Sequence, residues 1–187
     1  DWCFTNLVRV RYTEGGIAHE QGRIEVPYDD VFHGMLREDY IFTNPFIKRQ
    51  LLFDVGMYDE KLKTREDWDL NIRLIEGGYP FCHVDEPLYF YNIRGTSLMR
   101  GRKRLINDCT LYVLRKHHKR IADAGDRETA TIYAECLWWL AKSYMTDSHA
   151  VVPFLSCIRE SLAYDFNIKR LLNPLLSRLG VALNASV

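Results

Sequence analysis

The sequence predicts an α/β domain over residues 1–99, followed by an all-α helical tail over residues 100–187. Over residues 2–12, apolar side chains alternate with polar ones, which is typical of a strand with one buried face. After residue 96, apolar side chains recur at helical spacing instead. The switch between these two patterns divides the chain into its two regions.

Short strands and helices are expected to alternate in the first region. In chain order they are strands over 2–12 and 22–26, a helix over 29–37, a strand or loop over 42–47, a helical turn over 49–55, a helix over 66–76, and strands over 80–84 and 88–91. The Asp29-Asp30 pair favours a helix start, because negative charge stabilises a helix N-terminus. The helix that begins at Glu66 is expected to stop at Gly77-Gly78.

The second region is expected to contain four helices whose apolar stripes form a core. They cover 105–116, 132–144, 151–162 and 168–179. Asp126 precedes the second of them and is expected to cap it, since a carboxylate there can accept the free backbone N–H groups. These stripes indicate packing between helices rather than a cofactor site.

Charge and composition exclude several classes of protein. The net charge is zero, but residues 1–99 carry 11 Lys and Arg against 17 Asp and Glu, whereas residues 100–187 carry 14 against 8. Such asymmetry suggests two regions with different tasks. Neither region is strongly basic, so a nucleic-acid partner is not expected.

Cysteine usage and hydropathy indicate a cytoplasmic protein. The five cysteines are widely spaced, odd in number and without a C-x-x-C, so neither a disulfide framework nor a zinc site is expected. They are interpreted as small buried side chains in a reducing compartment. No apolar run approaches the roughly 18 residues of a membrane span.

The segment from Val55 to Arg100 carries a set of short motifs in a fixed order. They are V-G-M-Y-D-E at 55–60, E-D-W-D-L at 66–70, Arg73, G-G-Y at 77–79, P-L at 87–88, and Y-N-I-R-G-T-S at 91–97 with Arg100. This set resembles the family-2 glycosyltransferases with a GT-A fold, inverting enzymes that build bacterial surface polysaccharides. The resemblance implies that residues 1–99 are the C-terminal half of a mixed-sheet catalytic domain.

The resemblance also implies the reaction and its partners. A sugar would pass from a nucleotide-sugar donor to a hydroxyl of a glycan or lipid-linked acceptor. A divalent metal, Mg or Mn, would be held by a D-x-D motif in a nucleotide-binding half that precedes Asp1, and this chain alone is expected to be inactive. Asp67-Trp68-Asp69 has the same letters, but it opens a helix in the later motif, so no metal ligand is assigned within the chain.

The resemblance assigns Asp67 as the general base, and Glu66 beside it is a second catalytic candidate that would shape the acceptor site. Asp67 is expected to project beside the apolar Leu70 side of its helix, and a carboxylate near apolar surroundings needs a reason. The alternative is a capping box over residues 64–67, in which Asp67 only stabilises the helix start and Glu66 shares in the cap. Asp69 is interpreted as structural, paired with Arg73 on an exposed polar face.

Three further residues are expected to contact substrate. The resemblance places Trp68, Arg94 and Ser97 at the substrate site. Arg94 would contact the diphosphate, because guanidinium matches phosphate geometry; the alternative is a surface arginine on a loop. Many relatives have a histidine near this point that serves the metal, and this chain has none there.

Residues 100–120 carry eight Lys and Arg against one acid, Asp108. One interpretation is contact with an anionic membrane at its cytoplasmic face, where a lipid-linked acceptor would lie. The other is a solvated helix face. The rival to the enzyme hypothesis is a non-catalytic interaction module, in which the helical tail functions and the α/β part is a degenerate transferase remnant.

Overall fold

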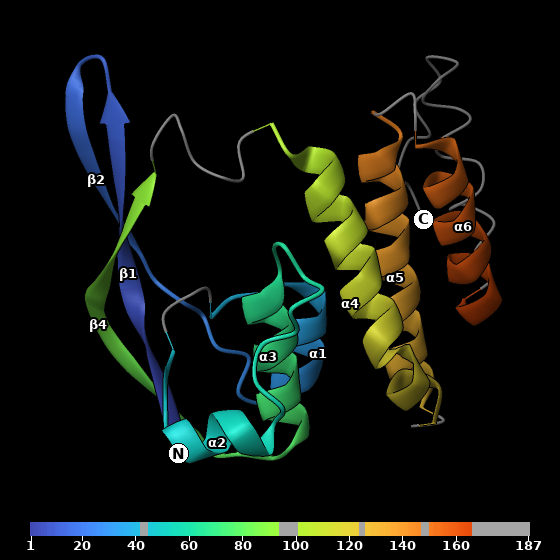
Figure 1. The fold of residues 1–187 in the computed structure, drawn as a ribbon, viewed down its shortest axis with the longest axis horizontal. Helices are drawn as coiled ribbons and strands as arrows, with labels where there is room; N and C mark the ends of the chain where they lie inside the picture. The colour runs from blue at the N-terminus through green and yellow to red at the C-terminus, as the bar shows by residue number, and fades with distance from the viewer. Residues whose placement is uncertain (42–44, 94–100, 124–125, 147–149, 166–187) are drawn as a thin grey trace, which may run out of the picture. The chain divides into compact units, whose positions relative to one another are not determined.

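The computed structural model describes residues 1–41, 45–93, 101–123, 126–146 and 150–165. It divides into two compact units, Asp1–Cys109 and Thr110–Val187. The division predicted from the sequence, between residues 99 and 100, lies outside the described residues. Strands occur in the first unit, and the described residues beyond 101 form only helices, so the mixed α/β class is confirmed (Figure 1).

The first unit contains four strands and three helices among its described residues before 94. They are β1 (Trp2–Thr13), β2 (Gly16–Gly22), α1 (Val31–Arg37), β3 (Phe46–Ile47), α2 (Arg49–Asp54), α3 (Glu66–Glu76) and β4 (Phe81–Ile93). The predicted bounds of α3 are confirmed, and beyond its end Gly78 takes a positive φ of 70° that glycine adopts without steric cost. The return strand predicted over 22–26 lies earlier, because Thr13 pairs with Gly16 in a tight hairpin.

Strand β1 is the centre of a mixed sheet. It pairs antiparallel with β2 at one end and with β3 at the other, and it pairs parallel with β4 along most of its length. The two strands predicted over 80–84 and 88–91 are one strand of 13 residues. The pairing of β1 with β4 shifts register on either side of Asn6, because β4 has extra residues there. The Asp85-Glu86-Pro87 segment therefore forms a bulge within β4 and does not end the strand.

Asn6 holds the sheet together at that bulge. It is buried, its Nδ2 donates to Asp85 Oδ1 at 2.7 Å, and its Oδ1 accepts from the Ile24 backbone N–H at 2.8 Å. His83 Nε2 lies 3.0 Å from the same Oδ1. Burial lowers the pKa of His83, although the Asp85 carboxylate opposes this, so the ring is neutral near pH 7 and can share in the network.

The second unit is built from helices. The described helices are α4 (Lys103–Asp123), which begins in the first unit, α5 (Arg127–Tyr144) and α6 (Val151–Tyr164). The predicted cap is confirmed, since Asp126 accepts from the Glu128 backbone N–H at 2.8 Å. Ser161 of α6 donates to the Ala134 carbonyl of α5 at 2.7 Å, which fixes the packing of these two helices. The helix predicted over 168–179 lies outside the described residues.

Within the described part of the chain, no helix has both the length and the apolar character needed to cross a membrane.

Candidate functional site

Helix α3 carries the predicted base, and packing fixes this helix firmly. Leu70, Ile72 and Leu74 are fully buried. The Trp68 indole is also buried, and its Nε1 donates to the Met35 carbonyl of α1 at 2.7 Å. The start of α3 is therefore held in one orientation relative to the rest of the first unit.

The N-cap of α3 lies one residue later than the alternative capping box over 64–67 requires. The N-cap residue is Arg65, in the left-handed conformation with φ 67°, and its side chain makes no cap hydrogen bond. The Asp67 carboxylate instead accepts from the neighbouring Trp68 backbone N–H at 2.8 Å. Asp67 therefore satisfies one helix N–H group through one of its oxygens.

The backbone around this helix start is strained. Among the described residues, only Met57 and Arg65 combine a side chain with positive φ, at 62° and 67°. Such conformations cost about 1–3 kcal/mol each and concentrate at functional sites. One of these residues precedes Tyr58 and the other precedes Glu66, and both of those residues line the same cavity.

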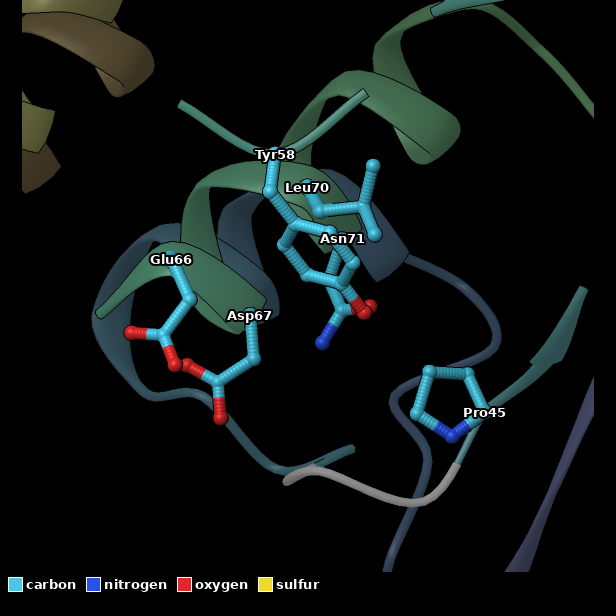
Figure 2. A pocket seen from close by; sticks show the side chains of 6 residues that line it. All are labelled: Pro45, Tyr58, Glu66, Asp67, Leu70 and Asn71. Atoms are coloured by element: carbon cyan, nitrogen blue, oxygen red, sulfur yellow. The ribbon is translucent and has the colours of Figure 1, made fainter. Parts of the chain in front are cut away.

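Figure 2 shows this cavity at the N-terminal end of α3. Its volume is about 330 Å³, at the small end of the range of roughly 300–1,000 Å³ for ligand sites. Its lining residues are Pro45, Tyr58, Glu66, Asp67, Leu70 and Asn71. The predicted position of Asp67 beside Leu70 is therefore found, and the two predicted catalytic carboxylates share one cavity.

Tyr58 brings an aromatic ring and a hydroxyl to the two carboxylates. Its side chain is 46% exposed, and it lies beside them in Figure 2. Burial, then the negative charges of Asp67 and Glu66, raise the pKa of the Tyr58 hydroxyl. The hydroxyl therefore remains protonated at neutral pH and can donate a hydrogen bond. The charged residues that line the cavity with it, Glu66 and Asp67, are both acidic.

Asn71 also lines the cavity, and no motif in the sequence predicts this role for it. It is completely buried, and its Nδ2 donates to Asp39 Oδ1 at 3.3 Å. Among the described residues, its Oδ1 has no hydrogen-bond partner. A buried acceptor without a partner costs about 1–3 kcal/mol, so a ligand hydroxyl that reached it would be bound favourably. The available signal was a polar residue between Leu70 and Ile72 on the apolar side of the helix.

Asp69 lies outside the cavity and stabilises the turn that carries Tyr58 through Arg73. Its side chain is fully buried, and Arg73 binds it through Nε at 3.0 Å and Nη2 at 2.9 Å. Arg73 also donates to the carbonyls of Val55 and Met57, on the turn that carries Tyr58. The prediction that this pair lies on an exposed face is wrong, because the 55–57 turn covers the face that periodicity alone assigns to solvent.

Of the other predicted substrate contacts, only Trp68 is among the described residues, and it does not line this cavity. Trp68 is only 5% exposed and packs in the core against α1. Arg94 and Ser97 lie outside the described residues. In the basic segment over 100–120, Arg104 pairs with Asp108 at 3.0 Å and Arg115 pairs with Glu160, so part of its charge is neutralised within the chain.

Comparisons of this chain with protein-family models, with curated proteins and with solved structures find no match.

Proposed function

We propose that this chain is the acceptor-binding part of an inverting glycosyltransferase with a GT-A-like arrangement, transferring a sugar from a nucleotide donor to a hydroxyl acceptor. The observation that carries the proposal is the joint placement of Asp67, Glu66 and Asn71 in one cavity. These groups accept hydrogen bonds, as a hydroxyl-rich acceptor requires. The ordered motifs over residues 55–100 support the same assignment.

The proposed chemistry is general-base catalysis by Asp67. Its carboxylate takes the proton of the acceptor hydroxyl while that oxygen attacks the anomeric carbon of the donor. The new glycosidic bond forms on the face opposite the departing nucleotide diphosphate, which inverts the configuration. Asn71 accepts a hydrogen bond from a second acceptor hydroxyl, and Tyr58 offers its ring to the apolar face of a sugar.

In this proposal the metal binds with the nucleotide-sugar donor, outside the acceptor cavity. A divalent cation would stabilise the charge of the leaving diphosphate. The motif that would hold it is expected in a preceding nucleotide-binding half, so none of the residues of this chain is proposed as its ligand. The proposed location is the cytoplasm, at the inner face of the membrane, with a glycan or lipid-linked acceptor.

A nucleotide-sugar screen on the complete gene product tests the proposal. We expect release of nucleoside diphosphate from at least one donor, dependent on Mg or Mn and accelerated by a saccharide or lipid-linked acceptor. The 187-residue chain is the negative control, and we expect it to release no nucleoside diphosphate. If the complete product binds no nucleotide sugar and the gene encodes no apolar strand ending in D-x-D upstream of Asp1, the non-catalytic interaction module replaces the enzyme.

A further inference from the structure

Two cysteines of the sheet lie directly opposite each other on neighbouring strands. Cys3 of β1 is the register partner of Cys82 of β4, in the parallel part of the sheet. The register pairs on either side bring their rings together: the centroids of Trp2 and Phe81 are 5.4 Å apart, and those of Phe4 and His83 are 5.0 Å apart. These contacts show that opposed side chains in this part of the sheet meet.

The two thiols therefore share one face of the sheet. Successive side chains of a strand point to opposite faces, so Cys3 and Cys82 lie on the face opposite the ring pairs. Neighbouring strands are about 4.8 Å apart, which lies within the roughly 4.4–6.8 Å between the Cα atoms of a disulfide. Both cysteines are free thiols in the structure.

Bridging would require a small local distortion. The Cβ atoms of a disulfide are about 3.8 Å apart, closer than the spacing of adjacent strands, so the two strands must be drawn together. A bond formed under such strain is easily reduced. The bridge is therefore suited to reversible oxidation rather than to permanent stabilisation.

Exposure also distinguishes this pair from the other cysteines. Cys82 is exposed and Cys3 half-buried, which corrects the expectation that all five cysteines are buried. Cys109 and Cys157 are buried, and burial raises the pKa of the Cys157 thiol to about 12, so little of its reactive thiolate forms. Cys136 is half-buried, on α5 of the helical unit.

We propose that Cys3 and Cys82 form a reversible cross-strand disulfide with a low-molecular-weight disulfide, such as oxidised glutathione, as the oxidant. The exposed Cys82 thiolate attacks the oxidant, forms a mixed disulfide and releases one glutathione thiolate. The Cys3 thiolate then attacks the Cys82 sulfur and releases the second. The two cysteines lose two protons and two electrons, and the oxidant is reduced to two thiols.

The position of the bridge gives it a connection to the candidate site. Cys3 also pairs with Phe46 of β3, and the residue before Phe46 is Pro45, which lines the cavity. β1 pairs with both β4 and β3, and Pro45 directly precedes β3. Drawing β1 toward β4 would therefore also shift β3 and, with it, Pro45 in the cavity wall. The inference itself depends only on the register of the sheet and is independent of the proposed transfer reaction.

Oxidation of the 187-residue chain with oxidised glutathione, followed by alkylation and peptide mass mapping, tests the proposal. We expect a mass loss of about 2 Da before alkylation, as for one disulfide. We also expect a peptide that links Cys3 to Cys82, and alkylation of the other three cysteines. Mild reduction should restore two alkylatable thiols at Cys3 and Cys82.

Two variants make the result specific. In Cys3→Ser the resolving thiol is missing, so one glutathione should remain attached at Cys82. Cys136→Ser is the matched control and should form the bridge as the wild type does. A stable glutathione adduct on wild-type Cys82, a link to another cysteine, or no reaction in the folded chain would each overturn the proposal.

Discussion

Among the described residues, the Asp67 carboxylate accepts a single hydrogen bond, from the Trp68 backbone N–H, and it lines the cavity. A carboxylate has about four acceptor positions, so one oxygen can satisfy the helix while the other accepts a proton from substrate. The two roles are therefore compatible in this geometry.

We predict that Asp67→Asn in the complete enzyme lowers kcat by roughly 10²–10⁴-fold and leaves donor affinity unchanged, because the amide cannot take a proton. The asparagine oxygen can still accept from Trp68, so the stability loss should be about 1 kcal/mol or less. Steady-state kinetics, donor titration and thermal melting measure the three quantities.

The matched control for this variant is Asp54→Asn. Asp54 is an exposed residue of α2 whose carboxylate accepts a hydrogen bond from Gln50 at 3.0 Å, and it does not line the cavity. Its turnover should equal that of the wild type. Near-wild-type turnover of Asp67→Asn with a lowered melting temperature would make Asp67 a residue of the scaffold.

Asn71 should act on the acceptor alone. We predict that Asn71→Leu raises the acceptor KM about 3–10-fold, the equivalent of one hydrogen bond, without changing acceptor-independent donor hydrolysis. The substitution removes a buried acceptor that has no partner, but it also removes the hydrogen bond from Asn71 to Asp39, so the net stability loss should be about 1 kcal/mol or less. Asn92→Leu, at an exposed position of β4, is the control, and an unchanged acceptor KM in Asn71→Leu would remove Asn71 from the site.

Asp69→Asn should be a stability variant. It removes one partner of a buried ion pair, a change that typically costs about 3–5 kcal/mol; because Arg73 keeps partial exposure, we expect about 3 kcal/mol. Urea unfolding of the 187-residue chain measures this loss. A change below about 0.5 kcal/mol would mean that the pair behaves as an ordinary surface i,i+4 pair after all.

At the scale of helices, an ionic contact joins α4 to α6 within the second unit. Arg115 donates to Glu160, and Arg115 Nη2 also donates to Ser156 Oγ at 2.7 Å. Burial opposes ionisation of Glu160, but the hydrogen bonds from Arg115 and Ser156 and the positive charges of Arg115 and Arg159 together outweigh it and hold the pKa of Glu160 below the usual value of 4.5. The folded helices therefore favour the charged carboxylate.

The sign of the resulting pH dependence follows from this lowered pKa. The contact stabilises the fold fully above the unfolded pKa, and its contribution is lost as the pH falls below 4.5 through the folded pKa. We predict that Glu160→Gln lowers the melting temperature at pH 7 and that its difference from the wild type shrinks below pH 4.5. A difference that stays constant from pH 7 into that acid range would show that the charge of Glu160 is not what stabilises the contact.

At the scale of the whole molecule, the chain has no net charge but an uneven distribution along its length. Residues 1–99 have an excess of six acidic groups, and residues 100–187 have an equal excess of basic groups. Attraction between opposite regions of two copies is screened by salt, with a Debye length of about 30 Å at 0.01 M and about 8 Å at 0.15 M.

We predict that the chain self-associates near its pI of about 7.2 at low ionic strength and disperses when salt is added. Light scattering at about 0.01 M and 0.15 M salt measures the change, because this range spans most of the screening. Association that grows with salt would indicate apolar contacts between copies instead of charge attraction.

Local patterns in the sequence were sufficient for features that depend on nearby residues. The bounds of α3, the Asp126 cap and the series of helices after residue 101 all follow from side chains within one or two turns of each other. The ordered motifs select Asp67 and Glu66 as candidates, and their meeting in one cavity follows from their adjacency on one helix start.

Tertiary structure decided what depends on contacts between distant segments. The parallel pairing of β1 with β4 joins segments nearly eighty residues apart, and it carries β4 through the Asp85-Glu86-Pro87 segment that reads locally as a turn. Burial of Asp69 requires the 55–57 turn that Arg73 binds, and burial of Asn71 requires segments that pack on α3 from elsewhere in the chain. Periodicity states which side of a helix is apolar, but only the neighbours that pack on the helix determine which polar side chains water can reach.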